Sequence, residues 1–187
     1  SSRLGCHKSL QRLQKIGYIK EYDLDTLAGR KIKLWGITSK GVYAISDPEL
    51  RPAKIKTFNS SKISLLTLPH RLKSHEVAIK TLDKGYKLNN SFDLFRSYGK
   101  IPDLVVSKLN QLISLEIELS IKTASRYEKI IQAYIEPLND NIVNSIVWIL
   151  PDEQSCIRLK KIFCNIPQSS VKDHQIITFE GYYSSLK

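Results

Sequence analysis

The feature that most constrains the fold is a short apolar run, Ser145 to Leu150, with a helical pattern on either side. This run has five consecutive apolar residues after Ser145, and such a short run between polar segments is typical of a buried strand, because helices usually need ten or more residues. Residues 122–135, which end before Pro137, and residues 153–163 have helical patterns. A buried strand between two helices indicates a mixed sheet covered on both faces, so the sequence predicts the α/β (α+β) class.

The other segments of residues 69–187 extend this pattern to the element order αβββαβαβ. We expect a helix at 70–86, strands at 92–98, 105–106 and 112–119, and a last strand at 175–179. The strands at 105–106 and 112–119 are expected to form a hairpin around a turn at 108–110. The apolar side of the helix at 70–86 is predicted to consist of Leu72, Val77, Ile79 and Leu82.

Residues 1–47 predict a smaller module. A helix around 9–16 ends at Gly17, strand-like alternations follow at 18–22 and 31–37, and a short helix is expected at 42–45. This order resembles the latter half of a winged helix-turn-helix domain, without that domain's first helices. Residues 48–68 are polar, contain Pro48 and Pro52, and are predicted to be a linker.

The positive charge is concentrated in the first third of the chain. The net charge is +11, and residues 1–62 contribute 13 − 5 = +8 of it, against 16 − 13 = +3 from residues 63–187. Such a surface favours a polyanion such as DNA, with strong salt dependence. A basic surface without a nucleic-acid partner, or one that contacts anionic lipid, is the alternative.

The winged-helix resemblance implies which basic residues face DNA. Arg3, His7, Lys8 and Arg12 lie on or beside the helix that would enter the major groove, and Arg30, Lys31 and Lys33 lie near the wing. The same charges would be merely solvated if the module docks on a protein instead.

No apolar run is long enough for a membrane span, and residues 1–8 do not resemble a signal peptide, so we expect a cytoplasmic protein without a membrane partner. The cysteines, Cys6, Cys156 and Cys164, are odd in number and lack CxxC spacing. This argues against a disulfide framework or a zinc site and predicts small core residues.

The acidic residues around the predicted hairpin are the strongest sign of chemistry. Strand alternation places Glu116 and Glu118 on one face, and antiparallel pairing brings Asp103 to the same edge. Clustered carboxylates repel one another unless they bind a cation, and hard oxygen ligands suit Mg²⁺ or Mn²⁺. Lys122, expected in the first turn of the next helix, could supply positive charge beside a phosphodiester. A solvated acidic face with an ordinary salt bridge is the plainer alternative.

These residues resemble the PD-(D/E)xK nuclease superfamily, whose restriction-endonuclease-like fold has this element order. Asp103 matches the acid of "PD" and Glu116 the acid of (D/E)xK, whereas Glu118 stands in the lysine position and Lys122 in a migrated one. Glu76 matches a further metal-site carboxylate of that superfamily.

The winged-helix pattern, "LPHRLKSHEV", "PD" and "LEIELSIKTASRYEKIIQAY" together resemble the replication-relaxation family, which includes MobC-type plasmid relaxases. The resemblance implies a metal-dependent endonuclease or relaxase that nicks or relaxes DNA at a plasmid origin, beside conjugation or replication proteins. It also matches His70, without implying a role for it. The alternative is a non-catalytic DNA-binding accessory protein with a decayed nuclease-like domain. A covalent mechanism would need a nucleophile such as Tyr127 or Tyr134, and spacing does not choose between them; an ordinary core or surface position is the favoured interpretation of Tyr127.

Overall fold

The computed structural model describes residues 3–25, 31–45, 58–59, 64–167 and 171–186. The chain divides into two compact units, Ser1–Leu68 and Pro69–Lys187. Most of the expected linker at 48–68, as well as Arg30, lies outside the described residues. Within the described part, no helix is both long and apolar enough to cross a membrane.

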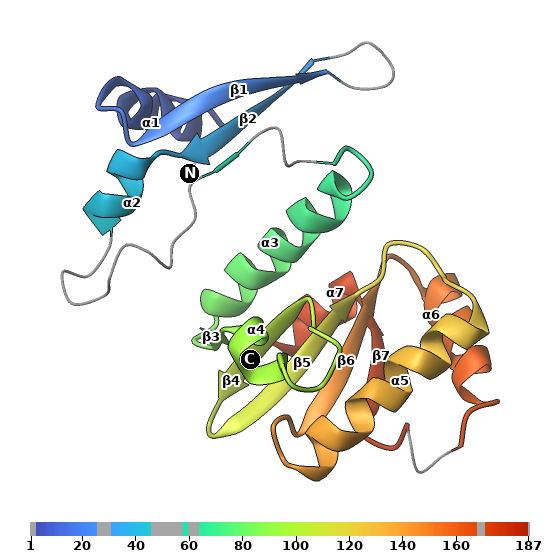
Figure 1. Ribbon diagram of the computed structural model, residues 1–187. Helices are drawn as coiled ribbons and strands as arrows, with labels where there is room; N and C mark the ends of the chain where they lie inside the picture. Colours follow the sequence, from blue (N-terminus) through green and yellow to red (C-terminus); the bar gives the residue numbers. More distant parts are fainter. Residues whose placement is uncertain (1–2, 26–30, 46–57, 60–63, 168–170, 187) are drawn as a thin grey trace. The chain divides into compact units, whose positions relative to one another are not determined.

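The first unit contains helix α1 (Arg3–Lys15), strands β1 (Ile19–Asp25) and β2 (Lys31–Ile37), and helix α2 (Ser39–Ile45) (Figure 1). The strands pair antiparallel from Ile19 opposite Ile37 to Asp25 opposite Lys31, as the alternation predicts. Thr38 fixes the start of α2, because its hydroxyl donates to the carbonyl oxygens of Gly17 and Tyr18 and accepts the Gly41 N–H. A side chain at Gly41 would meet the Tyr18 carbonyl oxygen at 2.1 Å, so this position requires glycine.

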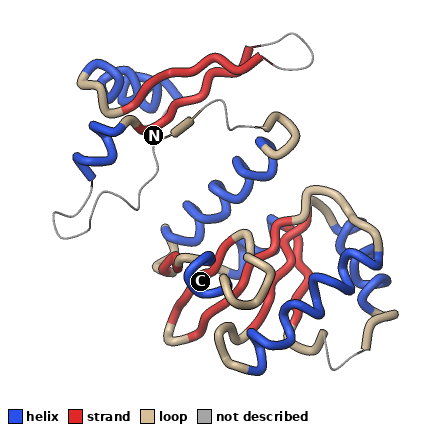
Figure 2. The backbone as a smooth tube through the Cα atoms, in the orientation of Figure 1, coloured by secondary structure: helices blue, strands red, loops and turns tan. Residues whose placement is uncertain are grey.

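The second unit is a five-stranded sheet with helices on both faces (Figure 2). Its elements in chain order are α3 (Leu68–Leu82), β3 (Lys87–Asn89), α4 (Ser91–Phe95), β4 (Leu104–Lys108), β5 (Gln111–Ile117), α5 (Ala124–Asn139), β6 (Ser145–Leu150), α6 (Glu153–Phe163), β7 (His174–Thr178) and α7 (Phe179–Ser185).

The strands lie in the order β3-β4-β5-β6-β7. Strands β3, β4 and β5 pair antiparallel, and β5, β6 and β7 pair parallel, so the sheet is mixed as predicted. Side chains of α5 and α6 pack on one face around Trp148, and α3 and α7 cover the other face around Ile149. The turn between β4 and β5 has positive φ angles at Leu109 and Asn110, which suit a tight hairpin.

The prediction of a strand at 92–98 is wrong. This segment begins with helix α4, and the short strand β3 precedes it at 87–89. The side chain of Asn90 accepts hydrogen bonds from the backbone N–H groups of Phe92 and Asp93, which caps the helix. The alternation of apolar residues does not report this local capping, and the final helix α7 was likewise not predicted.

The expected apolar side of α3 is also wrong in part. Val77 is buried, whereas Leu72, Ile79 and Leu82 are exposed, because the helix faces the sheet with Ser74, Val77, Ala78 and Thr81. Helix α5 does not end before Pro137 but includes it and continues to Asn139. Of the cysteines, Cys156 is a core residue as expected, but Cys6 and Cys164 are exposed.

Candidate active site at the acidic strand pair

Strand β5 ends at Ile117, and its last part with the residue that follows carries two glutamates, Glu116 and Glu118, into the interior of the second unit. Leu115 and Ile117 face α3 and α7, and Glu116 and Glu118 point to the opposite face, as alternation predicts. Both glutamates are buried, with only 3% and 2% of their surface exposed. A buried carboxylate needs compensating partners, because an unpaired charge out of water is very unfavourable.

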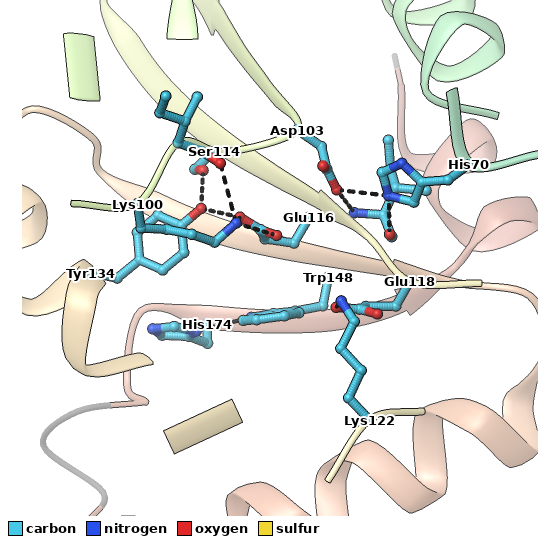
Figure 3. A network of polar contacts seen from close by, with 12 residues as sticks. His70, Lys100, Asp103, Ser114, Glu116, Glu118, Lys122, Tyr134, Trp148 and His174 are labelled. Carbon is cyan, nitrogen blue, oxygen red and sulfur yellow. Dashed lines mark hydrogen bonds and ion pairs between the residues drawn. The ribbon is translucent and has the colours of Figure 1, made fainter. Parts of the chain in front are cut away.

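Glu116 is compensated by Lys100 and Tyr134 (Figure 3). The Lys100 Nζ lies 2.7 Å from Oε1 and 3.0 Å from Oε2 of Glu116. The Tyr134 hydroxyl donates to Oε1 of Glu116 and lies 2.9 Å from the Ser114 Oγ. Burial raises the pKa of Glu116, Lys100 opposes this rise, and the nearby charge of Asp103 adds to it.

Glu118 has a different lysine. The Lys122 Nζ lies 2.5 Å from its Oε1. Lys122 precedes helix α5 rather than lying in its first turn, and its backbone N–H donates to the Tyr127 hydroxyl. Burial raises the pKa of Glu118, while the hydrogen bond and charge of Lys122 lower it and the charge of Asp103 raises it.

Asp103 lies immediately before β4, at the end where β4 and β5 part. The next residue, Leu104, pairs with Leu115, so Asp103 lies beside the end of β5. Its Oδ2 accepts the backbone N–H of Ile117 at 2.8 Å. The charge of Asp103 raises the pKa of both Glu116 and Glu118, so all three carboxylates belong to one region of the unit.

His70, near the beginning of α3, contacts Asp103 and the backbone of Ile117. Its Nε2 lies 2.8 Å from the Ile117 carbonyl oxygen and 3.2 Å from Oδ2 of Asp103. A carbonyl oxygen only accepts hydrogen bonds, so Nε2 carries the proton. His70 and Asp103 together satisfy the peptide groups of Ile117 where β4 has ended.

The structure brings Glu76 to a different cluster. Its carboxylate contacts Lys73 at 2.9 Å, Lys80 at 3.1 Å and the Tyr183 hydroxyl at 3.1 Å. The hydrogen bond from Lys73 is the main cause that lowers the pKa of Glu76 to about 2. These contacts on α3 and α7 make Glu76 a surface ion pair, so its role as a metal ligand stays a prediction.

Both candidate tyrosine nucleophiles are fully buried. Tyr127 and Tyr134 are 0% exposed and belong to the core beneath the sheet. Burial raises the pKa of Tyr127 to about 12, and burial together with the charge of Glu116 raises the pKa of Tyr134 well above its usual range. Neither phenol is available to attack a DNA phosphate in this arrangement, and Tyr134 instead orients Glu116.

The acids at 103 and 116 are carboxylates, which are the ligands that hard divalent cations prefer, and the charge of Asp103 opposes ionisation of Glu116 unless a cation is near. Among the described residues, no three histidine, cysteine, aspartate or glutamate side chains form a group that could hold a metal ion. Asp103 and Glu116 would thus be the two protein ligands. Mg²⁺ sites often use one or two carboxylates and take their other ligands from water and substrate phosphate.

Lys100 is the residue that sequence reasoning missed. It lies in an irregular segment between α4 and β4, where no period places a side chain. Its proximity to the "PD" acid was the one available signal. Lys122, which the sequence favoured, contacts Glu118 instead.

In the first unit, His7, Lys8 and Arg12 are exposed on α1, and Lys31 and Lys33 are exposed on β2. Lys33 forms an ion pair with Glu21 at 2.5 Å, so part of its charge is neutralised. Arg3 begins α1, but its side chain is outside the described part of the structure.

Comparison of the chain with protein-family models, with curated proteins and with solved structures finds no match.

Proposed function

We propose that this chain is a DNA-binding protein whose second unit cleaves phosphodiesters with Mg²⁺ or Mn²⁺, on a restriction-endonuclease-like fold. The observation that carries the proposal is the position of Asp103 beside the end of β5, where it accepts the N–H of Ile117 next to Glu116, together with the ammonium group of Lys100 on Glu116. The mixed sheet with its three antiparallel and two added parallel strands agrees with the fold of that superfamily.

The residues would divide the work as follows. Asp103 and Glu116 would hold the ion, which when bound supplies an acidic water for attack and neutralises charge on the phosphate. Tyr134 holds Glu116 from the interior, and His70 with the Ile117 N–H holds Asp103. Lys100 and Lys122 place positive charge beside the developing phosphate charge.

The first unit would deliver the DNA. Its net charge of +8 and the exposed basic residues of α1 suit a phosphate backbone. We propose that this unit is a partial winged helix and that the DNA is a plasmid or mobile-element origin, on the resemblance to replication-relaxation proteins.

The test is nicking of supercoiled plasmid with Mg²⁺, Mn²⁺ or a chelator. Asp103→Asn and Glu116→Gln are expected to reduce nicking at least about 100-fold, since even outer-shell partners of metal ligands typically contribute 10- to 100-fold. DNA affinity should be unchanged. Glu128→Gln, which alters an exposed acid on α5, is the matched control. Metal-independent nicking, or nicking that survives both variants, would refute the proposal.

One observation favours a second candidate. Glu116 and Glu118 each already have a lysine partner, so the buried charges are balanced by the protein itself. This arrangement suits a non-catalytic DNA-binding accessory protein whose nuclease-like unit has a structural role. DNA binding without metal-dependent cleavage would support this candidate.

A further inference from the structure

Lys100 occupies a cation position on Glu116. Its Nζ contacts both carboxylate oxygens, at 2.7 Å and 3.0 Å, which is how a small cation would be held. The same ammonium group is 3.2 Å from the Ile101 carbonyl oxygen. The side chain is 23% exposed, against 4% for that of Glu116. The lysine therefore lies between the buried carboxylate and the solvent.

The other side of Glu116 is closed by the interior. Tyr134 is fully buried and donates to Oε1, and Ser114, also fully buried, supports the phenol. Figure 3 shows Lys100 and Tyr134 converging on one carboxylate group. These contacts hold the carboxylate in place whichever cation compensates its charge.

The ion pair between Glu118 and Lys122 has a different geometry from that between Glu116 and Lys100. Lys122 contacts a single oxygen of Glu118, and the lysine is 30% exposed. Asp103, the second candidate ligand, accepts the N–H of Ile117, the residue that follows Glu116. A metal ion bound by Asp103 and Glu116 would compete with Lys100 for the oxygens of Glu116. Lys122 could keep its contact with Glu118.

From this geometry we infer that Lys100 gates the metal site: it is a resident counter-ion that must release Glu116 before a divalent cation can bind there. The inference deepens the proposed function and rests on it for the identity of the two ligands. Two cations cannot share so small a carboxylate site without strong repulsion. Once released, the flexible lysine is free to contact a DNA phosphate, which would link metal loading to substrate binding.

The test is Mn²⁺ affinity of the full chain, measured by electron paramagnetic resonance of free Mn²⁺ without DNA. The expected size follows from the fraction of molecules in which Lys100 has released Glu116. With a fraction of about a tenth, the apparent Kd for Mn²⁺ is about tenfold weaker than the intrinsic Kd of the open site. Lys100→Met should therefore bind Mn²⁺ about tenfold more tightly than the wild type. Lys129→Met, an exposed lysine of α5, should leave the affinity unchanged. Equal or weaker binding by folded Lys100→Met would overturn the inference.

Two further variants keep the test decisive if Lys100→Met does not fold. Lys100→Arg keeps the charge and offers a bidentate fork to the carboxylate, so it should hold Glu116 more firmly and weaken Mn²⁺ binding. Unchanged or tighter binding would overturn the inference. Lys100→Met with Glu116→Gln removes both partners and should lose the gain in affinity. A retained gain would show that Mn²⁺ binds elsewhere and would also overturn it.

The inference and the proposed function fail separately. If Lys100→Met binds Mn²⁺ more tightly but the wild type never nicks DNA with any metal, the inference about Lys100 is retained and the nuclease proposal is refuted. If the wild type nicks DNA but substitutions at position 100 leave the Mn²⁺ affinity unchanged, the nuclease proposal is retained and the inference about Lys100 is refuted.

Discussion

The two units of this chain handle charge in opposite ways. The first has a net charge of +8, and most of its described basic side chains are exposed. The second has a net charge of +3 but buries two glutamates beneath its sheet and compensates each with a lysine. Exposed charge attracts a polyanion from solution, whereas buried and oriented charge can act on one bond. This contrast is the basis for our proposal that the first unit captures DNA and the second carries out the chemistry.

The largest expected effect is on the core that holds the second unit together. Trp148 is fully buried, and its ring packs against Tyr127, Phe163 and His174. Trp148→Ala should reduce the free energy of unfolding of this unit by about 3–5 kcal/mol. Urea denaturation followed by circular dichroism measures the loss. Leu13→Ala, at a 38% exposed position on α1, should have little effect. Similar losses from both variants would contradict the claim that the cluster around Trp148 stabilises the second unit.

Acid should weaken the second unit through His174. Burial lowers the pKa of His174 to about 4 from 6.5. The unfolded chain therefore takes up the proton first, and the stability that neutral His174 contributes is complete above pH 6.5 and is lost as the pH falls towards 4. The loss is at most about 3 kcal/mol. Urea midpoints across this range should fall less steeply for His174→Gln than for the wild type. Parallel curves would contradict the prediction.

A smaller effect is expected for DNA capture. Lys8→Gln with Arg12→Gln removes two exposed charges of α1. DNA binding should weaken, and the slope of log affinity against log salt should become shallower by about 2, since each phosphate contact contributes roughly 0.9. Fluorescence anisotropy at several salt concentrations measures the slope. Lys160→Gln with Lys161→Gln, in the exposed last turn of α6, is the matched control. An equal loss in both double variants would show that the basic first unit has no special part in binding.

The smallest change in the free energy of unfolding is expected for an exposed ion pair in the first unit. Lys33 and Glu21 lie 2.5 Å apart on the hairpin, with Lys33 68% exposed. Exposed pairs typically contribute between 0 and about 1 kcal/mol. Lys33→Gln should change the free energy of unfolding by less than about 1 kcal/mol in thermal denaturation. A larger loss would mean that surface pairing, and not only burial, holds the first unit together.

The sequence predicted the parts of the fold that depend on local pattern. The apolar strand at 145–150 and the helix at 153–163 are found with the predicted bounds, because a continuous apolar run and a capped amphipathic pattern are local signals. The segment at 92–98 was mistaken for a strand, since one side-chain cap at Asn90 decides it. The exposed face of α3 could not be predicted either, because neighbouring elements determine which side of a helix is covered.

The candidate site was predicted only in outline. Alternation placed Glu116 and Glu118 together, and strand pairing placed Asp103 near them. Their burial and their partners depend on contacts between distant segments, such as Lys100 with Glu116 across 16 residues and Tyr134 with Glu116 across 18. No periodicity in the sequence reports such contacts.

The most direct test of the account is a crystal of the chain grown with Mn²⁺ and examined by anomalous scattering. We predict a manganese peak between the carboxylates of Asp103 and Glu116, with the Lys100 ammonium displaced from Glu116. A crystal with Mn²⁺ bound elsewhere, or with none bound while Lys100 still holds both oxygens of Glu116, would contradict the proposed metal-dependent chemistry.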